Sequence, residues 1–442
     1  VATYADLCKV GTGTDGWTLD AEYIQTADIQ CPAGSNFPRI GQNPGTPFTG
    51  TYDGNGYEIR DLQMSYGDFH TGMFIVLGSA GVVQNLTLVD VDASSTTPRF
   101  GALVGLSSGT ISGCAVSGTL TGTTYTGGLV GVMEGGTVSD CQSSCTITSD
   151  DQSGGLIGYM TNGTVTNCHA SGSVSSEDHD GFALGGLVGS ISDGTIVDSF
   201  ASGDVAAGDG SHLGGLIGGG RDSSLTRCYA TGSVSAGTRS MFVGGLVGKS
   251  ALTIYDSYAE GNVSGGDCLG GLIGDMDRGR VENCSASGTV FGTYHDGYPA
   301  GGLIGGLTTG TVTGSYSTGN VSTGWYVGGL VGTQRSESVI QDCYATGDVS
   351  AIASTYPPMA GGLVGACAGT ISSSYSTGSV LAPDAPAEYA EYAGGLVGYV
   401  EGGLVTSSYW DLEASGYTTS AAGTGKTTAE MKTIATFAGW NI

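Results

Sequence analysis

The chain repeats a short apolar signal at a regular interval. Gly-Gly-Leu-(Val/Ile)-Gly begins at residues 127, 154, 185, 214, 244, 270, 301, 328, 361 and 394, and a near-copy, Gly-Ala-Leu-Val-Gly, begins at 101. The mean spacing is about 29 residues, inside the window of roughly 20–50 residues that is typical of solenoids and arrays. The pattern therefore predicts about eleven stacked units in place of a few separate globules.

Each unit continues with an apolar residue, a turn residue and a short alternation, as in the segment from Gly163 to Val174. Side chains alternate between the two faces of a strand, so Cys168, Ala170 and Val174 share one face, and their equivalents are small enough for a narrow interior. Most of the turn residues tolerate a left-handed backbone, which predicts a corner at each. The turn positions are Gly113, Asp140, Asn167, Asp198, Arg227, Asp256, Asn283, Gly314, Asp342, Ser373 and Ser407.

No segment shows ten or more residues of helical periodicity, so we expect an all-β chain. The predicted fold is a right-handed parallel β-helix, or β-solenoid, of about eleven coils with capping segments at both ends. Residues 1–75 would form an N-terminal cap and the first strands, 76–410 the solenoid, and 411–442 a C-terminal cap. Thr427 and Glu430 fit a capping box that opens a short helix, after which Phe437 and Trp440 would cover the last coil.

Composition and charge narrow the class of protein. Glycine supplies 83 of the 442 residues, charged residues are only 12%, and the net charge is −27. This charge disfavours nucleic acid and anionic membranes as partners. There is no apolar run of ~18 residues for membrane insertion. Because the chain begins at Val1 without a signal segment, we expect a mature, exported and extracellular protein.

The repeat carries a family resemblance. Gly-Gly-Leu-(Val/Ile)-Gly with a trailing Gly-Thr-Val and Cys-Tyr-Ala-Thr-Gly-x-Val resembles the GLUG-motif repeats of secreted bacterial and archaeal surface proteins, over roughly residues 72–410. Segments from Tyr23, from Phe48 and from Ser408 onward resemble the family's first and closing segments. The acidic charge and the cysteine content also resemble those of the cell-sheath proteins of filamentous methanogens. The resemblance implies a β-solenoid at the cell surface.

The eleven cysteines fall into three groups. Cys8 and Cys31 flank the first segment and are candidates for a disulfide that ties down a small N-terminal helix; the alternative is that both are buried and reduced. Cys114, Cys141 and Cys168 occupy one repeat position and should stack as an interior ladder, either bridged or as small apolar thiols. The candidates for intermolecular bridges, which lie off this ladder, are Cys145, Cys268 and Cys367.

Two surfaces are candidates for contact with partners. In each signal, the leucine and the following Val or Ile are adjacent, so a straight strand would expose one aliphatic ladder, whereas a bend at glycine would bury both. The loops between units form an acidic and aromatic edge that would bind sugars, or cations such as calcium, unless its residues are merely solvated. These loop residues are Asp150, Asp151, Asp178, Asp180, Asp209, Asp267, Asp296, Asp384, Glu388, Glu391, Phe182, Phe242, Tyr294, Tyr298, Trp325, Tyr326, Tyr356, Tyr389 and Tyr392.

Catalytic signals are weak. The segment from Gly105 to Gly109 matches Gly-x-Ser-x-Gly, the motif of a serine nucleophile elbow. That motif requires a helix after it, whereas the sequence here predicts a further strand. The five histidines show no paired spacing. We therefore expect no catalytic residue, no bound cofactor and no dedicated metal site, although surface cations and surface glycans remain candidate partners. The predicted function is an extracellular structural protein that self-assembles as a homopolymer into a coat or sheath; the alternatives are an adhesin or carbohydrate-binding stalk and, last, a polysaccharide-cleaving enzyme.

Overall fold

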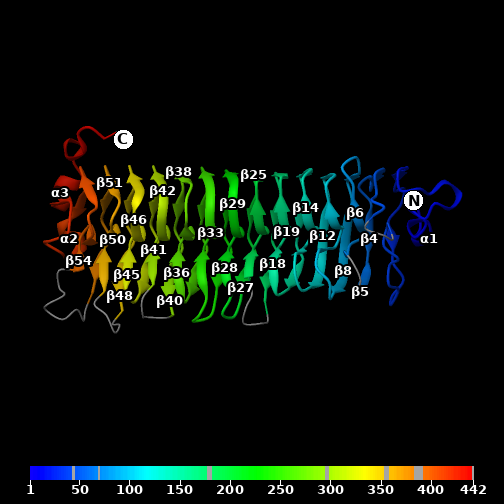
Figure 1. Cartoon of the computed structure of the whole chain (residues 1–442), viewed down its shortest axis with the longest axis horizontal. Coiled ribbons are helices and arrows are strands. Elements are labelled where there is room, and N and C mark those ends of the chain that lie inside the picture. Colours follow the sequence, from blue (N-terminus) through cyan, green and yellow to red (C-terminus); the bar gives the residue numbers. More distant parts are fainter. Residues whose placement is uncertain are drawn as a thin grey trace. The chain divides into compact units, whose positions relative to one another are not determined.

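The computed structural model describes residues 1–41, 45–67, 70–176, 182–293, 298–352, 358–382 and 392–440. Contacts divide the chain into two compact units: Val1–Ala207 with Leu216–Ser224 form unit 1, and Gly208–Gly215 with Leu225–Ile442 form unit 2. Within each unit, the strands of successive coils lie side by side (Figure 1). This division does not test the boundaries predicted after residues 75 and 410, which stay predictions.

Unit 1 stacks parallel coils in register. One coil consists of β14 (Val130–Glu134), β15 (Thr137–Ser139), β16 (Gln142–Ser143), β17 (Thr146–Thr148) and β18 (Asp151–Gly154), and the next of β19 (Ile157–Thr161), β20 (Thr164–Thr166), β21 (His169–Ala170), β22 (Val174–Ser175) and β23 (Phe182–Gly185). Val130 pairs with Ile157, and Ile147 with Val174. Because equivalent repeat positions pair with each other, the predicted parallel β-solenoid is confirmed.

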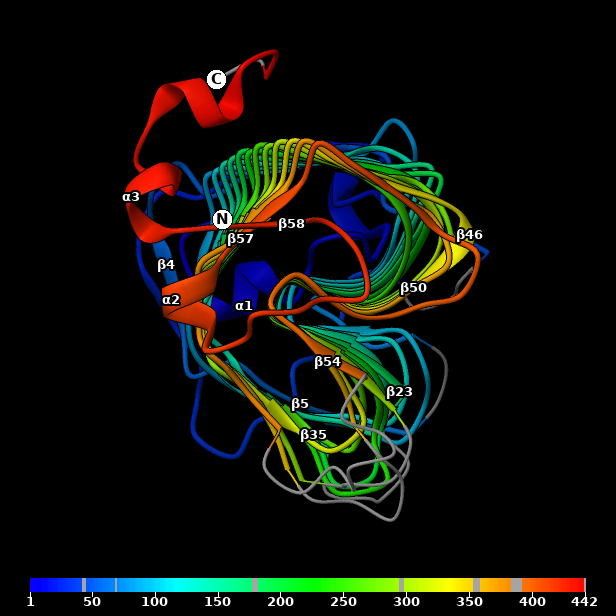
Figure 2. The same cartoon turned by 90° about the vertical axis from the view of Figure 1, so that its left-hand side faces the viewer.

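Unit 2 has the same design, with each coil divided among three sheets. In one coil, sheet A contains β37 (Ile273–Met276) and β38 (Arg280–Glu282), sheet B contains β39 (Ser285–Ala286) and β40 (Val290–Gly292), and sheet C contains β41 (Pro299–Gly301). In Figure 2, which shows the C-terminal end, sheet C is labelled at β54 (Ala393–Gly394), sheet A at β50 (Val364–Cys367) and sheet B at β57 (Tyr409–Asp411). In each coil the chain passes from sheet C to sheet A and then to sheet B. It turns counter-clockwise while approaching the viewer, so the coil is right-handed.

The predicted corners are confirmed. All eleven turn residues, from Gly113 to Ser407, have φ between 46° and 60°, the left-handed region. Glycine, Asn and Asp enter this region at low cost. Each corner turns the chain from sheet A into sheet B, and the small residue two or three positions later, such as Ala170 or Ala259, is buried in the interior. The local residue types therefore set where every coil bends.

Short helices occur at both ends of the chain. The N-terminal segment contains α1 (Tyr4–Leu7) and η1 (Thr14–Gly16), and coils begin already at β1 (Glu22–Ile24), which pairs with β3 (Thr51–Asp53). The C-terminal segment contains α2 (Leu412–Ser415), β58 (Thr424–Lys426), α3 (Thr428–Met431) and η3 (Ile434–Phe437). Thr427 and Glu430 form the predicted capping box. In the described part of the chain, the helices are too short to span a bilayer.

Candidate functional site

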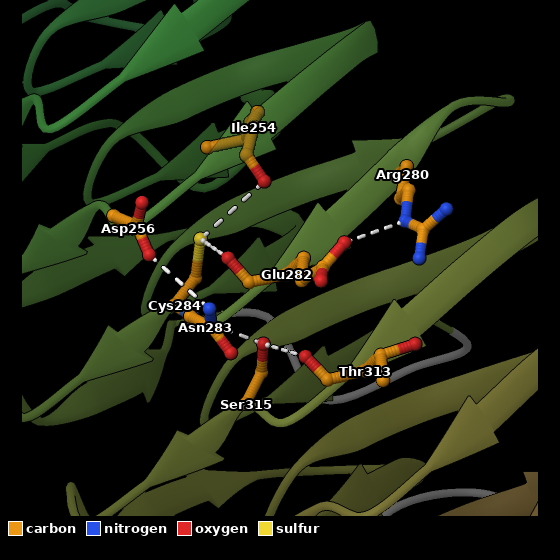
Figure 3. Close-up of polar contacts among 8 residues, drawn as sticks. All are labelled: Ile254, Asp256, Arg280, Glu282, Asn283, Cys284, Thr313 and Ser315. Carbon is orange, nitrogen blue, oxygen red and sulfur yellow. Dashed lines mark hydrogen bonds and ion pairs between the residues drawn. The ribbon is translucent and has the colours of Figure 1, made fainter.

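The corner before Cys284 shows how neighbouring coils are joined (Figure 3). The Asn283 side-chain amide donates to Asp256 Oδ1 at 3.2 Å, across two successive corners. The Cys284 thiol donates to the carbonyl oxygens of Ile254 and Glu282, at 3.6 and 3.2 Å, and the Cys284 N–H donates to Ser315 Oγ at 3.0 Å. The buried thiol and the buried hydroxyl thus satisfy backbone groups inside the coil.

The expected interior ladder is present in unit 1. The N–H of Cys114 donates to Cys141 Sγ, and the N–H of Cys141 donates to Cys168 Sγ, both at 3.4 Å. The N–H of Cys168 donates in turn to Ser199 Oγ at 3.1 Å. All three cysteines are reduced and buried. Either Cys or Ser can occupy this repeat position, because each side chain accepts the hydrogen bond of the previous coil and fits the narrow interior.

The off-ladder cysteines do not share one environment. Cys145 and Cys367 are buried, and burial raises the pKa of each thiol to about 11. A buried thiol reaches a second chain only if its coil opens, so this placement disfavours the expected intermolecular bridges at these two positions, which stay predictions. Cys268 is half-buried with a left-handed φ of 49°, and its bridging stays a prediction.

The N-terminal pair lies close together. Cys8 follows α1, and Cys31 follows β2 (Ile29–Gln30). Burial raises the pKa of Cys31 to about 11, and the neighbouring Cys8 contributes to this rise. Both residues are thiols in this structure, and their pairing in the native protein stays a prediction.

The expected outward aliphatic ladder is absent, and the bend alternative is correct. In every signal the leucine and the following Val or Ile are both fully buried, as at Leu272 and Ile273. The N–H groups of these two residues both donate to the Leu303 carbonyl, each at 2.9 Å. Two successive N–H groups cannot share one acceptor in a straight strand, so the chain bends there and both side chains enter the core.

The predicted loop edge is described only in part. Phe182 and Tyr298 are exposed, Trp325 and Tyr326 stack at 4.9 Å, and Asp267 is buried. Asp178, Asp180, Tyr294, Asp296, Tyr356, Asp384, Glu388, Tyr389 and Glu391 lie outside the described residues, as do His179 and His295. Among the described residues, no group of three or more His, Cys, Asp or Glu could hold a metal ion. Sugar or cation binding at this edge stays a prediction.

A polar cluster that the sequence patterns did not indicate lies between sheets A and C of unit 2. His212 on β28 (Ser211–Gly214) packs its ring 5.3 Å from that of Phe242 on β32 (Met241–Gly244), and Lys249 Nζ lies 4.6 Å from the Phe242 ring centroid. Lys249 also approaches carboxylate oxygens of Asp275 and Asp277, at 3.9 and 3.4 Å. Burial lowers the pKa of His212 to about 4. His212 and Phe242 each lie two residues before a repeat signal, and Lys249 directly follows one. These residues become neighbours because the coils stack.

The Asp275 carboxyl gives a pH-dependent prediction. Burial, with a contribution from Asp277, raises its pKa to about 6 from 3.8, although Lys249 opposes the rise. Above pH 6 the Asp275 carboxylate is charged in both states, and its charge is less stable in the folded state than in the unfolded state. This charge therefore lowers the free energy of unfolding, and the loss disappears as pH falls from 6 towards 4 and the folded-state carboxyl takes up a proton. Asp275→Asn should raise the free energy of unfolding by about 2 kcal/mol at pH 8 and leave it nearly unchanged at pH 4.

Urea unfolding at the two pH values measures this difference. Asp277→Asn is the matched control, because the Asp277 side chain is 48% exposed whereas that of Asp275 is 13% exposed. An equal gain from Asp275→Asn at both pH values would contradict the assignment of the effect to the buried charge.

Sheet A of unit 2 ends in an open edge. The strands β55 (Val397–Val400) and β56 (Leu404–Thr406) pair on one side with β50 and β51 (Thr370–Ser372). On the opposite side, no strand among the described residues pairs with β55 after Val397 or with β56. The rest of the last coil is covered: residues 419–421 bond to Gly395 and Val397, and β58 pairs with β57. Leu404 is 59% exposed on this edge. An open strand edge is a template for pairing with another strand.

Comparison with known proteins identifies the repeat. The sequence model of the GLUG motif matches residues 152–175, 209–235, 265–290 and 323–350. Halomucin of Haloquadratum walsbyi is 35% identical over 122 residues, which are 26% of this chain and 1% of Halomucin, so the match spans about a hundredth of that relative.

Two solved structures are similar at low scores. A Bacteroides ovatus protein, provisionally assigned as an immunoglobulin A1 protease, has a TM-score of 0.30 and 17% identity, over 100% of this chain and 87% of its own. An IgA1 protease has a TM-score of 0.36 and 16% identity, over 78% of this chain and 21% of its own. Likeness at these scores carries no argument about activity.

Proposed function

Because the chain is built from repeats of the GLUG motif, we propose that it is an extracellular structural protein whose copies assemble end to end into a coat of the cell surface. The open edge of sheet A in unit 2 is the observation that carries this proposal. The family resemblance to secreted surface proteins and the net charge of −27 support an exposed, extracellular role. The buried aliphatic pairs do not offer an apolar side face for assembly, whereas a disulfide through Cys268 stays a separate prediction.

The backbone of Val405 is the part of the edge that would engage a second copy. The Leu404 N–H donates to the Gly369 carbonyl at 2.9 Å, and the Thr406 carbonyl accepts from the Ser373 N–H at 3.3 Å. Because backbone groups alternate between the two sides of a parallel strand, the N–H and C=O of Val405 point to the open side. The partner would be the edge strand of a second copy, since repetition of one contact at each end builds a filament.

Proline at this position tests the proposal. Val405→Pro removes the outward N–H, and proline is tolerated where a strand faces solvent. Wild-type protein should form filaments in electron micrographs and large particles in light scattering once salt screens the charge, whereas Val405→Pro should stay monomeric. Val405→Ala is the matched control, because it trims the side chain but keeps the N–H, and it should assemble.

Circular dichroism and the melting temperature would verify that both variants fold. A wild-type protein that stays monomeric at all salt concentrations, that stops at a dimer, or that assembles equally as Val405→Pro would contradict the proposal.

A further inference from the structure

A cavity of about 430 Å³ lies in unit 2 between the outer face of sheet B and the C-terminal segment. The aromatic lining residues are Tyr375 of sheet B and Phe437 and Trp440 of the C-terminal segment, and the threonines that line the cavity are Thr346, Thr377 and Thr428. The volume falls within the range of roughly 300–1,000 Å³ that small-molecule sites occupy. Neither the repeat signal nor the assembly proposed above accounts for this cavity.

The aromatic lining residues continue a row of stacked tyrosine rings on the outer face of sheet B. Tyr316, Tyr344 and Tyr375 stack at 4.8 and 5.1 Å with ring planes within 8° of parallel, so each ring covers the face of the next. Trp440 stacks on Tyr409, the last ring, at 5.6 Å. Phe437 meets the Trp440 ring edge-on at 4.9 Å. Phe437 and Trp440 therefore cover the side of the last coils. The sequence pattern had predicted that they would cover the end of the last coil instead.

The C-terminal segment is anchored to sheet B at one edge of the cavity by Asp411, the last residue of β57. Both Asp411 carboxylate oxygens accept from the Thr428 hydroxyl at 2.8 Å, and Oδ1 also accepts from the N–H groups of Glu413 and Ala414. The Asp411 carboxylate is thus committed to anchoring α2 and α3, and in Figure 2 α3 lies outside the coil beside β57. Ile434 is 79% exposed, whereas Phe437 and Trp440 pack against the rings of Tyr375 and Tyr409 on sheet B.

The lining favours a neutral saccharide as the ligand. Aromatic rings stack on the C–H faces of a sugar ring, while threonine hydroxyls match its hydroxyl groups as donors and acceptors. The lining contains one cation, Lys432, and one carboxylate, Asp411. Because the chain has a net charge of −27 and repels anions, phosphate and polyanionic ligands are disfavoured. We propose that this cavity binds the end of a neutral hexose oligosaccharide.

The two threonines of sheet B supply the test. Thr318, Thr346 and Thr377 occupy one ladder position, since the N–H of each donates to the previous coil, at 2.9, 3.0 and 3.0 Å. Thr346→Val and Thr377→Val remove a hydroxyl that lines the cavity, and Thr318→Val removes the equivalent hydroxyl outside it. The probes are tetramers of β-1,4-linked glucose, β-1,4-linked N-acetylglucosamine and α-1,4-linked mannose, titrated to millimolar concentration by calorimetry and by tryptophan fluorescence.

At least one probe should bind wild-type protein and change its tryptophan emission. Thr377→Val and Thr346→Val should each weaken that binding about three- to tenfold, the value of a lost neutral hydrogen bond, while Thr318→Val should bind as wild type. Trp440→Phe should keep the calorimetric signal and lose the fluorescence change, which locates the ligand.

Absence of binding by all three probes, or equal weakening by Thr318→Val, would overturn the proposal. The site does not rest on end-to-end assembly, because Val405→Pro should bind the same probe with unchanged affinity. Failure of one proposal is therefore distinguishable from failure of the other.

Discussion

Gly302→Ala should destabilise the protein by about 3 kcal/mol or more, because overpacking against backbone cannot be relieved by side-chain movement. Gly302 is the second glycine of its signal, at the passage from sheet C to sheet A. A methyl group there would overlap the carbonyl oxygen of Gly329 in the next coil and the Ser317 hydroxyl across the interior. Chemical unfolding followed by circular dichroism measures the loss.

Gly306→Ala is the matched control on β42 (Ile304–Thr313). A methyl group at Gly306 would meet Asp275 Oδ1 at 2.6 Å, and this flexible carboxylate can swing away. The control should cost less than Gly302→Ala, about 1 kcal/mol, because the atom that has to move is the end of a side chain and not backbone. Comparable stability of Gly302→Ala and wild type would show that neighbouring coils can separate to admit a side chain.

Removal of the Cys8–Cys31 bridge should also have a large effect. If oxidation joins the two thiols, closure of the intervening loop would stabilise the native protein by about 3 kcal/mol in the chain-entropy model. Cys8→Ser should then lower the free energy of unfolding by that amount without reductant and by nearly nothing with it. Non-reducing peptide mapping should recover the peptides of Cys8 and Cys31 as one linked species.

The reduced protein is the internal control for this prediction, because it contains the same side chains without the bond. Recovery of both cysteines as free thiols from the native protein would contradict the bridge. In that case the buried, reduced alternative would hold, with the raised pKa of Cys31 protecting the thiol from oxidation.

Local signals predicted the corners and the helix capping box correctly. Asn283 and Asp256 stand at corners because their residue types tolerate a left-handed backbone, and the structure places both there. The capping box at Thr427 and Glu430 is likewise a property of four consecutive residues. The cysteine ladder followed from its spacing of one repeat, since parallel coils bring equivalent positions together.

Contacts between coils were harder to predict from the sequence. The alternation pattern left the direction of Leu272 and Ile273 open, because a shared acceptor in the next coil decides the bend. Cys145 and Cys367 lie off the ladder in sequence yet are buried. Lys249 and Asp275 occupy equivalent repeat positions in neighbouring coils, but the approach of Lys249 to the Phe242 ring of sheet C depends on how the two sheets pack.

The sequence by itself determined that this chain forms parallel coils, where each coil turns and which small residues enter its interior, because backbone preference and repeat spacing act locally. Only the tertiary structure decided which strand edge stays open, which thiols are accessible and where the C-terminal segment leaves a cavity. Those features depend on how each coil packs against residues about thirty or more positions away, and on how the segment after the last coil packs. No local sequence pattern encodes that packing.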